Sequence, residues 1–157
     1  MNRSMRRKDR QMSTADAHDL LQKAEYGVLS TVDALGQPYG VPVSFALDGS
    51  QAIFFHSAPE GQKLDNLRNQ PRVCFTVVGH TQVLAQQFST IFESVIVFGI
   101  AEEVEGSQKR HGLQLLAAKY NPGEAAAGEA YIDKHGQATQ VVRIRVQQIS
   151  GKERKAG

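Results

Sequence analysis

The chain has 157 residues, of which 41% are hydrophobic and 22% are charged, and its formal net charge is +2. This length fits one domain with an adequate core, and this composition excludes the disordered and fibrous classes. The sequence therefore predicts a single globular unit.

Basic residues gather at the two ends of the chain, whereas the body is close to neutral. We expect residues 1–12 to form a basic arm, residues 13–150 the single domain, and residues 151–157 a basic tail. Charge runs at termini are usually solvated arms, and the sequence contains no helix-turn-helix pattern, RNA-binding aromatic signature or zinc finger. We therefore do not expect nucleic-acid binding.

Cys74 is the only cysteine, which excludes an intrachain disulfide and a Cys-x-x-Cys motif for metal or redox chemistry. It lies in an apolar run and is expected to be a small buried hydrophobe. No apolar run reaches the length of a membrane span, and the arginine-rich start is not followed by the apolar segment of a signal peptide. These features predict a cytoplasmic protein with no membrane contact.

The chain begins its regular structure with a helix and a strand. Ser13 precedes Asp16 by three residues, close to a capping box, and apolar residues then recur at helical spacing. This pattern predicts a helix over about 14–25. A short β-branched run predicts a strand over 26–32, and residues 33–37 supply its turn.

Two further strands complete an antiparallel meander. Residues 38–47 alternate apolar and other positions, and two prolines in this strand indicate a sheet edge or a bulge. Asp48-Gly49 is a strong signal for a tight turn. The following strand is therefore expected over 51–56, antiparallel to its predecessor.

The middle of the chain predicts a helix over about 61–69, stopped by Pro71, and then a strand over 72–78. The polar stretch 79–87 predicts a loop. Residues 90–104 form the longest strand candidate, and both of its faces are largely apolar. One face is expected to cover the core and the other to meet a second surface.

The last third of the chain predicts helices followed by a final strand. Ser107 is expected to cap one helix, and Asn121-Pro122 begins an alanine-rich segment that ends near Gly136. A strand around 142–146 then closes the chain, with apolar residues inward and two arginines outward. Antiparallel strands with interspersed helices predict a β-barrel with peripheral helices.

The stretch from 53 to 71 carries the first candidate site. An apolar strand ends at His56 and Ser57, a polar turn follows, and the next helix begins with free backbone N–H groups and Lys63. Hydroxyl, imidazole, amide and ammonium groups together suit a phosphate. Two other interpretations stay open at this point: Lys63 can simply be solvated, and His56 can be structural.

Six short motifs occur in a specific order over residues 5–152: MRRKDR at 5–10, GVLST at 27–31, GQPYGVPV at 36–43, FHSA at 55–58 with Gly61 and Lys63, SVIVFG at 94–99, and KY at 119–120. In this order they resemble the FMN-binding split-barrel proteins related to pyridoxamine 5'-phosphate oxidase, and most closely the nitroimidazole-resistance branch. The resemblance implies a mainly β fold with peripheral helices, built as a six-stranded antiparallel split β-barrel. It also implies a homodimer with two flavin sites at the subunit interface.

The resemblance further implies roles for particular residues. Groups matching His56, Ser57 and Lys63 hold the FMN phosphate and ribityl chain. The residues matching Leu29, Ser30, Thr31, Val41 and Val43 lie along the isoalloxazine, and those matching Glu93 and Ser94 approach from the partner. Members of the superfamily differ in cofactor: some bind FMN, others bind haem or the deazaflavin F420. Some nitroimidazole-resistance proteins bind no flavin and carry a modification on the histidine that matches His56.

The function implied by the resemblance is an FMN-dependent oxidoreductase that takes electrons from NAD(P)H and reduces a small aromatic acceptor such as a nitroimidazole. The flavin carries such chemistry, so no catalytic side chain is named. We expect Val41, Val43, Phe54 and Phe92 to wall an apolar cleft in which a flat acceptor stacks. The alternatives are a non-catalytic dimer that binds or senses flavin or haem, and a structural dimer with an empty site.

Other chemistry has no support in the sequence. GxGxxG, P-loop, HExxH and GxSxG motifs are absent. His18, His80, His111 and His135 show no metal-ligand spacing and are expected at the surface, so no metal site is predicted.

Overall fold

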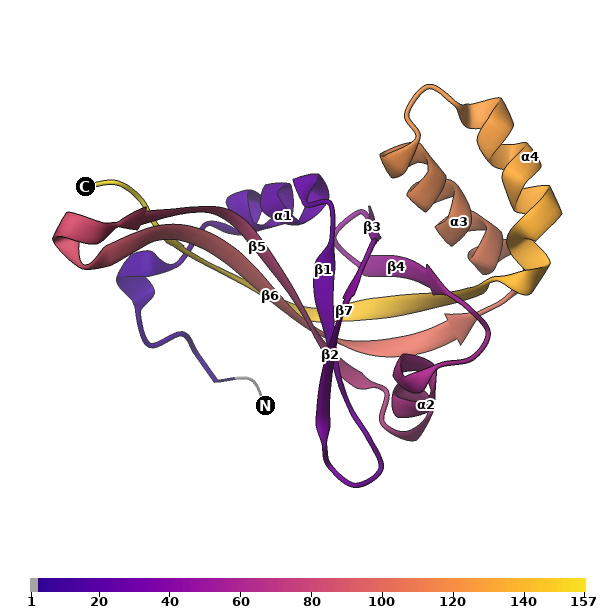
Figure 1. The fold of residues 1–157 in the computed structure, drawn as a ribbon, viewed down its shortest axis with the longest axis horizontal. Coiled ribbons are helices and arrows are strands. Elements are labelled where there is room, and N and C mark those ends of the chain that lie inside the picture. The colour runs from indigo at the N-terminus through magenta and orange to yellow at the C-terminus, as the bar shows by residue number, and fades with distance from the viewer. Residues whose placement is uncertain (1–2) are drawn as a thin grey trace.

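The computed structural model describes residues 3–157, in which helices surround one antiparallel sheet (Figure 1). The strands are β1 Gly27–Val32, β2 Pro38–Val43, β3 Ala46–Asp48, β4 Ala52–Ser57, β5 Arg72–Leu84, β6 Ser89–Val104 and β7 Gln140–Arg154. The helices are α1 Thr14–Lys23, α2 Gln62–Asn69, α3 Gly106–Tyr120 and α4 Ala125–His135, and short 3-10 turns lie at 8–10, 85–87 and 136–138. In these residues the sheet has seven strands in the order β2-β1-β5-β6-β7-β4-β3.

The expected mainly β fold with peripheral helices is confirmed, but the expected number of six strands is wrong. The predicted strand over 38–47 is broken into β2 and β3, which pair with β1 and β4 and lie at opposite edges of the open sheet. The break falls at Phe45, whose N–H donates to Tyr120 Oη at 3.0 Å and whose carbonyl accepts from Lys119 Nζ at 2.9 Å. Because side chains of α3 satisfy this backbone, the chain can leave one ladder and enter another.

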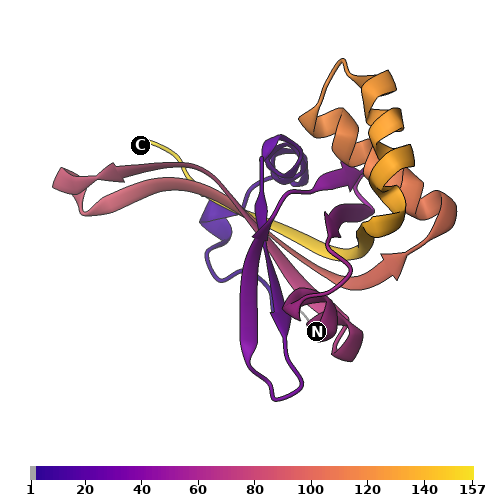
Figure 2. The ribbon, with the colours of Figure 1, turned by 45° about the vertical axis from the view of Figure 1, so that its right-hand side comes forward.

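The predicted loop over 79–87 is also wrong. β5 continues to Leu84 and pairs with β6 as far as Ser89, with a register shift between Val78 and Thr81. The paired strands extend away from the body as a ribbon, which we call the β5–β6 arm (residues 79–93; Figures 1 and 2). Most side chains of the arm are exposed, so the sequence here lacks the apolar alternation that marks a half-buried strand.

The core lies on the inner face of the curved sheet. Its largest fully buried side chains are Phe45, Phe55, Phe75, Leu21, Leu29, Ile53, Leu64 and Ile144. A second, smaller cluster of Ala52, Phe54, Val104 and Val141 lies under α3. Gly112 permits this contact, because a Cβ atom there would lie 2.5 Å from the ring of Phe54. The close approach of α3 to β4 positions the cleft described below.

Of the two serine caps predicted from the sequence, one occurs in the structure. Ser13 caps α1 as expected, since its Oγ accepts the N–H of Asp16 at 3.0 Å. The predicted cap at Ser107 is wrong: α3 begins at Gly106, with Glu105 in the N-cap position. β7 continues to Arg154 and Gln11 bridges to Lys152, so the sheet extends past residue 150. Over residues 3–157, no helix combines the length and apolarity that a membrane crossing needs.

Candidate functional site

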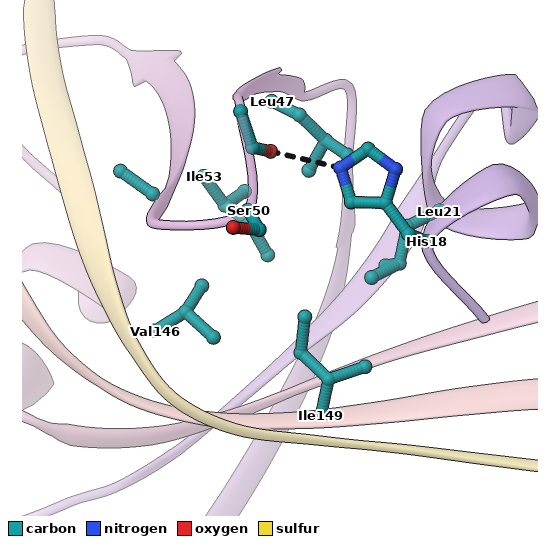
Figure 3. Close-up of a pocket in the computed structure, with 9 residues that line it drawn as sticks. His18, Leu21, Leu47, Ser50, Ile53, Val146 and Ile149 are labelled. Atoms are coloured by element: carbon teal, nitrogen blue, oxygen red, sulfur yellow. Dashed lines mark hydrogen bonds between the residues drawn. The ribbon is translucent and has the colours of Figure 1, made fainter. Parts of the chain in front are cut away.

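A hollow between α1 and the β3–β4 turn is closed by packing (Figure 3). His18 donates from Nε2 to the carbonyl oxygen of Gly49 at 3.0 Å, while Leu21, Ile53 and Val146 fill the space behind it. The side chains leave no volume for a water molecule. This hollow is a structural joint that ties the turn to α1, and His18 serves that joint.

A second region lies at the junction of β4 and α2, where Lys63 is near enough to His56 to affect its pKa, while Ser57, the next residue of β4, is buried on the opposite face of the sheet. Ser57 is buried and donates its hydroxyl hydrogen to the carbonyl of Ala58 at 2.8 Å. Gly61 occupies the N-cap position of α2 with φ 146°, and no side chain caps this helix. Lys63 is half-buried and forms no ion pair with any carboxylate in residues 3–157. We call this region the phosphate corner.

The phosphate corner fits the phosphate group of a flavin nucleotide. The first N–H groups of an uncapped helix are free donors, and the helix dipole favours an anion there. An ideal Cβ atom built on Gly61 meets nothing within 4 Å, so the backbone is open to close approach. The unpaired ammonium of Lys63 supplies the matching charge.

The surroundings of His56 in this region shift its pKa. Desolvation, and then the positive charge of Lys63, lower the pKa of His56 below its ordinary value of 6.5. The imidazole is therefore neutral near pH 7, with one nitrogen that can donate and one that can accept a hydrogen bond.

The residues expected along the isoalloxazine lie on the paired strands β1 and β2. Leu29 and Thr31 are buried, and Leu29 lies opposite Val41 in the ladder. Thr31 Oγ1 accepts a hydrogen bond from Asn66 Nδ2 at 2.9 Å, which ties β1 to α2. Val41 and Val43 are half-buried against the core, so part of each side chain stays open. Ser30, one residue from Leu29 and Thr31, points to the opposite face of the sheet.

Glu93 and Ser94 lie elsewhere in the same chain. The Oε1 atom of Glu93 accepts the N–H of His80 at 3.0 Å, in the β5–β6 arm. His56 pairs with Val141 of β7, and Val141 pairs with Val104 of β6, so His56 lies level with Val104 in the sheet. Glu93 is therefore about 35 Å away along the strand. One protomer does not bring Glu93 and Ser94 to the phosphate corner.

A cleft of about 570 Å³ opens between the α3–α4 hairpin and the end of β4, and we call it the α3–α4 cleft. Its apolar wall consists of Leu113, Leu116, Ala117, Ala127, Gly128 and Ile132. Its polar and aromatic lining consists of Ser44, His56, Tyr120, Asn121, Glu124, Tyr131 and Thr139. His56 thus borders both the cleft and the phosphate corner.

Ionic and amide contacts hold the two helices of this hairpin together. Arg110 on α3 forms ion pairs with Glu129 and with Asp133 (2.9 Å) on α4. Gln114 donates to Glu129 at 2.7 Å. These bonds link one turn of α3, from Arg110 to Gln114, to one turn of α4, from Glu129 to Asp133, and hold the two helices of the wall together.

The expected cleft of Val41, Val43, Phe54 and Phe92 does not form. Phe54 is 2% exposed and lies under α3, while Phe92 pairs with Arg154 far along β6. The cleft is lined instead by residues of the α3–α4 hairpin, which the sequence did not mark as site residues. The alanine- and glycine-rich composition of 117–128 was the available signal, because small residues on facing helices leave room between them.

The end of α3 fixes one side of the cleft. Tyr120 Oη donates to the carbonyl of Glu25 and accepts from the N–H of Phe45. Lys119 Nζ lies 3.8 Å from the ring centroid of Phe45, and burial lowers the pKa of Lys119 to about 8.

Within residues 3–157, no group of three His, Cys, Asp or Glu side chains could hold a metal ion.

Comparison with solved structures gives close fold relatives. The chain is 25% identical, with TM-score 0.79, to a Bacteroides thetaiotaomicron protein provisionally assigned as a 5-nitroimidazole antibiotic resistance protein, covering 91% of this chain and 86% of that one. It is 27% identical, with TM-score 0.67, to an FAD-binding protein from Mesorhizobium loti, with coverage of 93% and 98%. An FAD- and haem-binding protein from Mycobacterium smegmatis is 22% identical, with TM-score 0.82 and coverage of 94% and 74%.

No curated protein matches the sequence. The family model of pyridoxamine 5'-phosphate oxidase, in contrast, matches residues 13–153, which include β1 to β6, all four α-helices and most of β7. This match agrees with the split-barrel fold and with the structural relatives. The chain belongs to the pyridoxamine 5'-phosphate oxidase family.

Proposed function

We propose that this protein is a cytoplasmic, homodimeric oxidoreductase that binds FMN and transfers electrons from NAD(P)H to a small aromatic acceptor such as a nitroimidazole. The observation that carries the proposal is the position of His56, which borders the phosphate corner on one side and the α3–α4 cleft on the other. Ser44, which follows the last residue of β2, also lines the cleft, so an acceptor there would border both the phosphate corner and the end of β2, along which the flavin ring would lie.

Each part of the site has a distinct task in this proposal. Lys63 and the N-terminal N–H groups of α2 bind the phosphate, while the backbone of β1 and β2 lies along the ring system. A bound flavin supplies hydride acceptance and electron transfer. The apolar wall of the cleft excludes water and orients the acceptor, and neutral His56 can donate a hydrogen bond to it.

The structural relatives support the flavin part of the proposal. One relative at 27% identity binds FAD, and one at 25% identity is linked with nitroimidazole resistance. A second candidate function is haem or flavin binding without turnover. The imidazole of His56 beside an apolar cleft favours it, as does the fold shared with an FAD- and haem-binding protein.

A binding experiment tests the phosphate corner directly. Lys63→Ala removes one charge-assisted contact, so FMN affinity should fall by about ten- to a hundredfold, or about 1.5–3 kcal/mol. Riboflavin lacks the phosphate and should bind almost equally to the variant and the parent. Fluorescence titration with both ligands measures this, and Lys23→Ala, which removes a 73% exposed lysine side chain of α1, serves as the charge-matched control. An equal loss for riboflavin would show that Lys63 does not bind the phosphate.

Stopped-flow reoxidation tests the turnover. The FMN-loaded protein is reduced anaerobically with dithionite and mixed with a nitroimidazole. Reoxidation faster than that of free FMN supports the reductase, and so does bleaching of the flavin bands on anaerobic addition of NADPH. Reoxidation no faster than that of free FMN favours the binding function instead, and a Soret band in the purified protein identifies haem.

A further inference from the structure

The α3–α4 cleft has a charge character that the family match does not assign. We infer that this cleft selects a planar aromatic cation, a molecule with a quaternised or protonated ring nitrogen, over neutral and anionic rings of the same size. The inference names the acceptor class and so rests on the proposed function for its biological use, but the binding itself requires no flavin.

The size and wall of the cleft suit a flat ring system. A volume of about 570 Å³ lies in the range of small-molecule sites. One wall is apolar, from Leu116 to Ile132, and is held in place by the ion pairs between α3 and α4. A planar molecule can therefore be desolvated there without rearrangement of the helices.

Two tyrosine rings line the cleft, Tyr120 held in place by hydrogen bonds and Tyr131 67% exposed. Tyr120 is anchored at its hydroxyl by Glu25 and Phe45, so its ring cannot rotate away. Tyr131 packs against His135 with ring centroids 4.4 Å apart. Aromatic faces attract a cation within about 6 Å and attract neutral rings by stacking alone.

The only carboxylate of the lining is Glu124, and no arginine or lysine lines the cleft within residues 3–157. Glu124 occupies the N-cap position of α4 but makes no side-chain cap bond. No ion pair of Glu124 occurs in the described part of the chain, so its carboxylate is available to a ligand. Lys119 Nζ donates to the carbonyl of Phe45 and lies 5.3 Å from the ring centroid of Tyr120, so the face of Tyr120 toward Lys119 already has a cation beside it.

The phosphate corner attracts the opposite charge to the α3–α4 cleft. Lys63 and the uncapped N-terminus of α2 attract anions, whereas at the uncapped N-terminus of α4 the Glu124 carboxylate supplies a negative charge and, with the ring of Tyr131, favours cations. His56 between them contributes no positive charge near pH 7, because its pKa is lowered. The two regions therefore discriminate between an anionic nucleotide and a cationic acceptor.

Three probes of nearly equal shape test the inference: N-methylacridinium, neutral acridine and acridine-9-carboxylate, titrated by fluorescence at mildly alkaline pH. Measured with flavin-free protein, the cation should bind roughly tenfold more tightly than acridine, and the carboxylate more weakly than either. Equal affinity for all three probes, or tighter binding of the carboxylate, would overturn the inference.

Matched variants identify the residues responsible. Glu124→Gln should weaken N-methylacridinium binding by roughly five- to tenfold and leave acridine binding unchanged. Glu105→Gln is the control, because Glu105 is the N-cap of α3, also lacks a cap bond and lies outside the cleft. If both variants lost the preference for the cation, or if neither did, the proposed role of Glu124 would be contradicted.

A steric pair locates the site and separates it from the flavin. Ala127→Trp should abolish binding of all three probes, whereas Ala126→Trp, at an exposed position outside the lining, should preserve it. Equal effects of the two substitutions would show that the probes bind elsewhere.

FMN should bind without displacing the cationic probe, and displacement of one probe molecule by each FMN would assign the cleft to the flavin. Absence of FMN binding, in contrast, removes the proposed function while the probe results stand.

Discussion

His56 is a side chain whose titration reports on the site. Desolvation and then the Lys63 charge lower its pKa, so the folded protein releases this proton below pH 6.5. NMR titration of the imidazole should therefore give a pKa under 6.5. Because desolvation is the larger cause, Lys63→Ala should raise this pKa but not restore 6.5. A value at or above 6.5 in the parent would contradict the assigned environment.

The same shift makes stability depend on pH. Between 6.5 and the lowered pKa of His56, the unfolded chain binds more protons than the folded protein, so stability falls as the solution is acidified. His56→Asn removes this contribution. As the pH falls from 7 into the acid range, the urea midpoint of the parent should decrease relative to that of the variant. A difference between the two midpoints that does not change with pH would exclude this linkage.

The C-terminal turn of α3 joins three segments of the chain at Tyr120. Its hydroxyl binds the backbone of Glu25 and Phe45, where β2 and β3 separate. Tyr120→Phe should lower the free energy of unfolding by about 1–3 kcal/mol, because it leaves the N–H of Phe45 without its partner. Tyr131→Phe, which alters an exposed side chain, should change it by less than about 0.5 kcal/mol. Urea denaturation measures both, and equal effects would contradict the clamp.

The long β6–β7 ladder depends on a glycine at its irregularity. A Cβ atom on Gly99 would lie 2.5 Å from the carbonyl oxygen of Arg145, next to the register shift between Phe98 and Gly99. Gly99→Ala should therefore destabilise the protein by about 1–3 kcal/mol. Gly128→Ala, within α4 and 3.4 Å from the Cβ of Ala117, should instead stabilise it by up to about 1 kcal/mol. Thermal unfolding of both variants distinguishes the two environments.

The outer face of the sheet predicts how two copies associate. Val78 is 62% exposed and Ile96 38% exposed on adjacent strands, so residues 3–157 leave the second apolar face of β6 partly uncovered. Apolar surface of this kind is typical of obligate interfaces. A homodimer would also allow Glu93 and Ser94 to reach the partner's site, which they cannot do within their own chain.

Light scattering at micromolar concentration should give a mass of about 34 kDa, twice the 17.2 kDa of one chain. Ile96→Glu should shift this mass toward the monomer, because it places a charge on the apolar face. Leu35→Glu, at a 94% exposed position in the β1–β2 turn, is the matched control and should stay dimeric. A monomeric parent protein would refute the homodimer.

The sequence alone determined the features that depend on neighbouring residues. The cap at Ser13, the turn at Asp48-Gly49 and the strand–turn–helix unit from His56 to Lys63 all occur where the pattern predicted them. Each rests on a local property, such as a hydroxyl before a helix or a glycine with positive φ. The phosphate corner was predictable for this reason, since a strand end and the next helix start are adjacent in the chain.

Other features came from contacts between distant segments. The break at Phe45 that makes seven strands depends on Lys119 and Tyr120, and the cleft exists because α3 and α4 dock beside His56. The β5–β6 arm is held by ladder bonds rather than by buried side chains, so apolar periodicity could not reveal it. Local sequence encodes caps, turns and periodicity. Which strand is interrupted, and where helices leave a cleft, is decided by packing free energy that no short stretch of sequence contains.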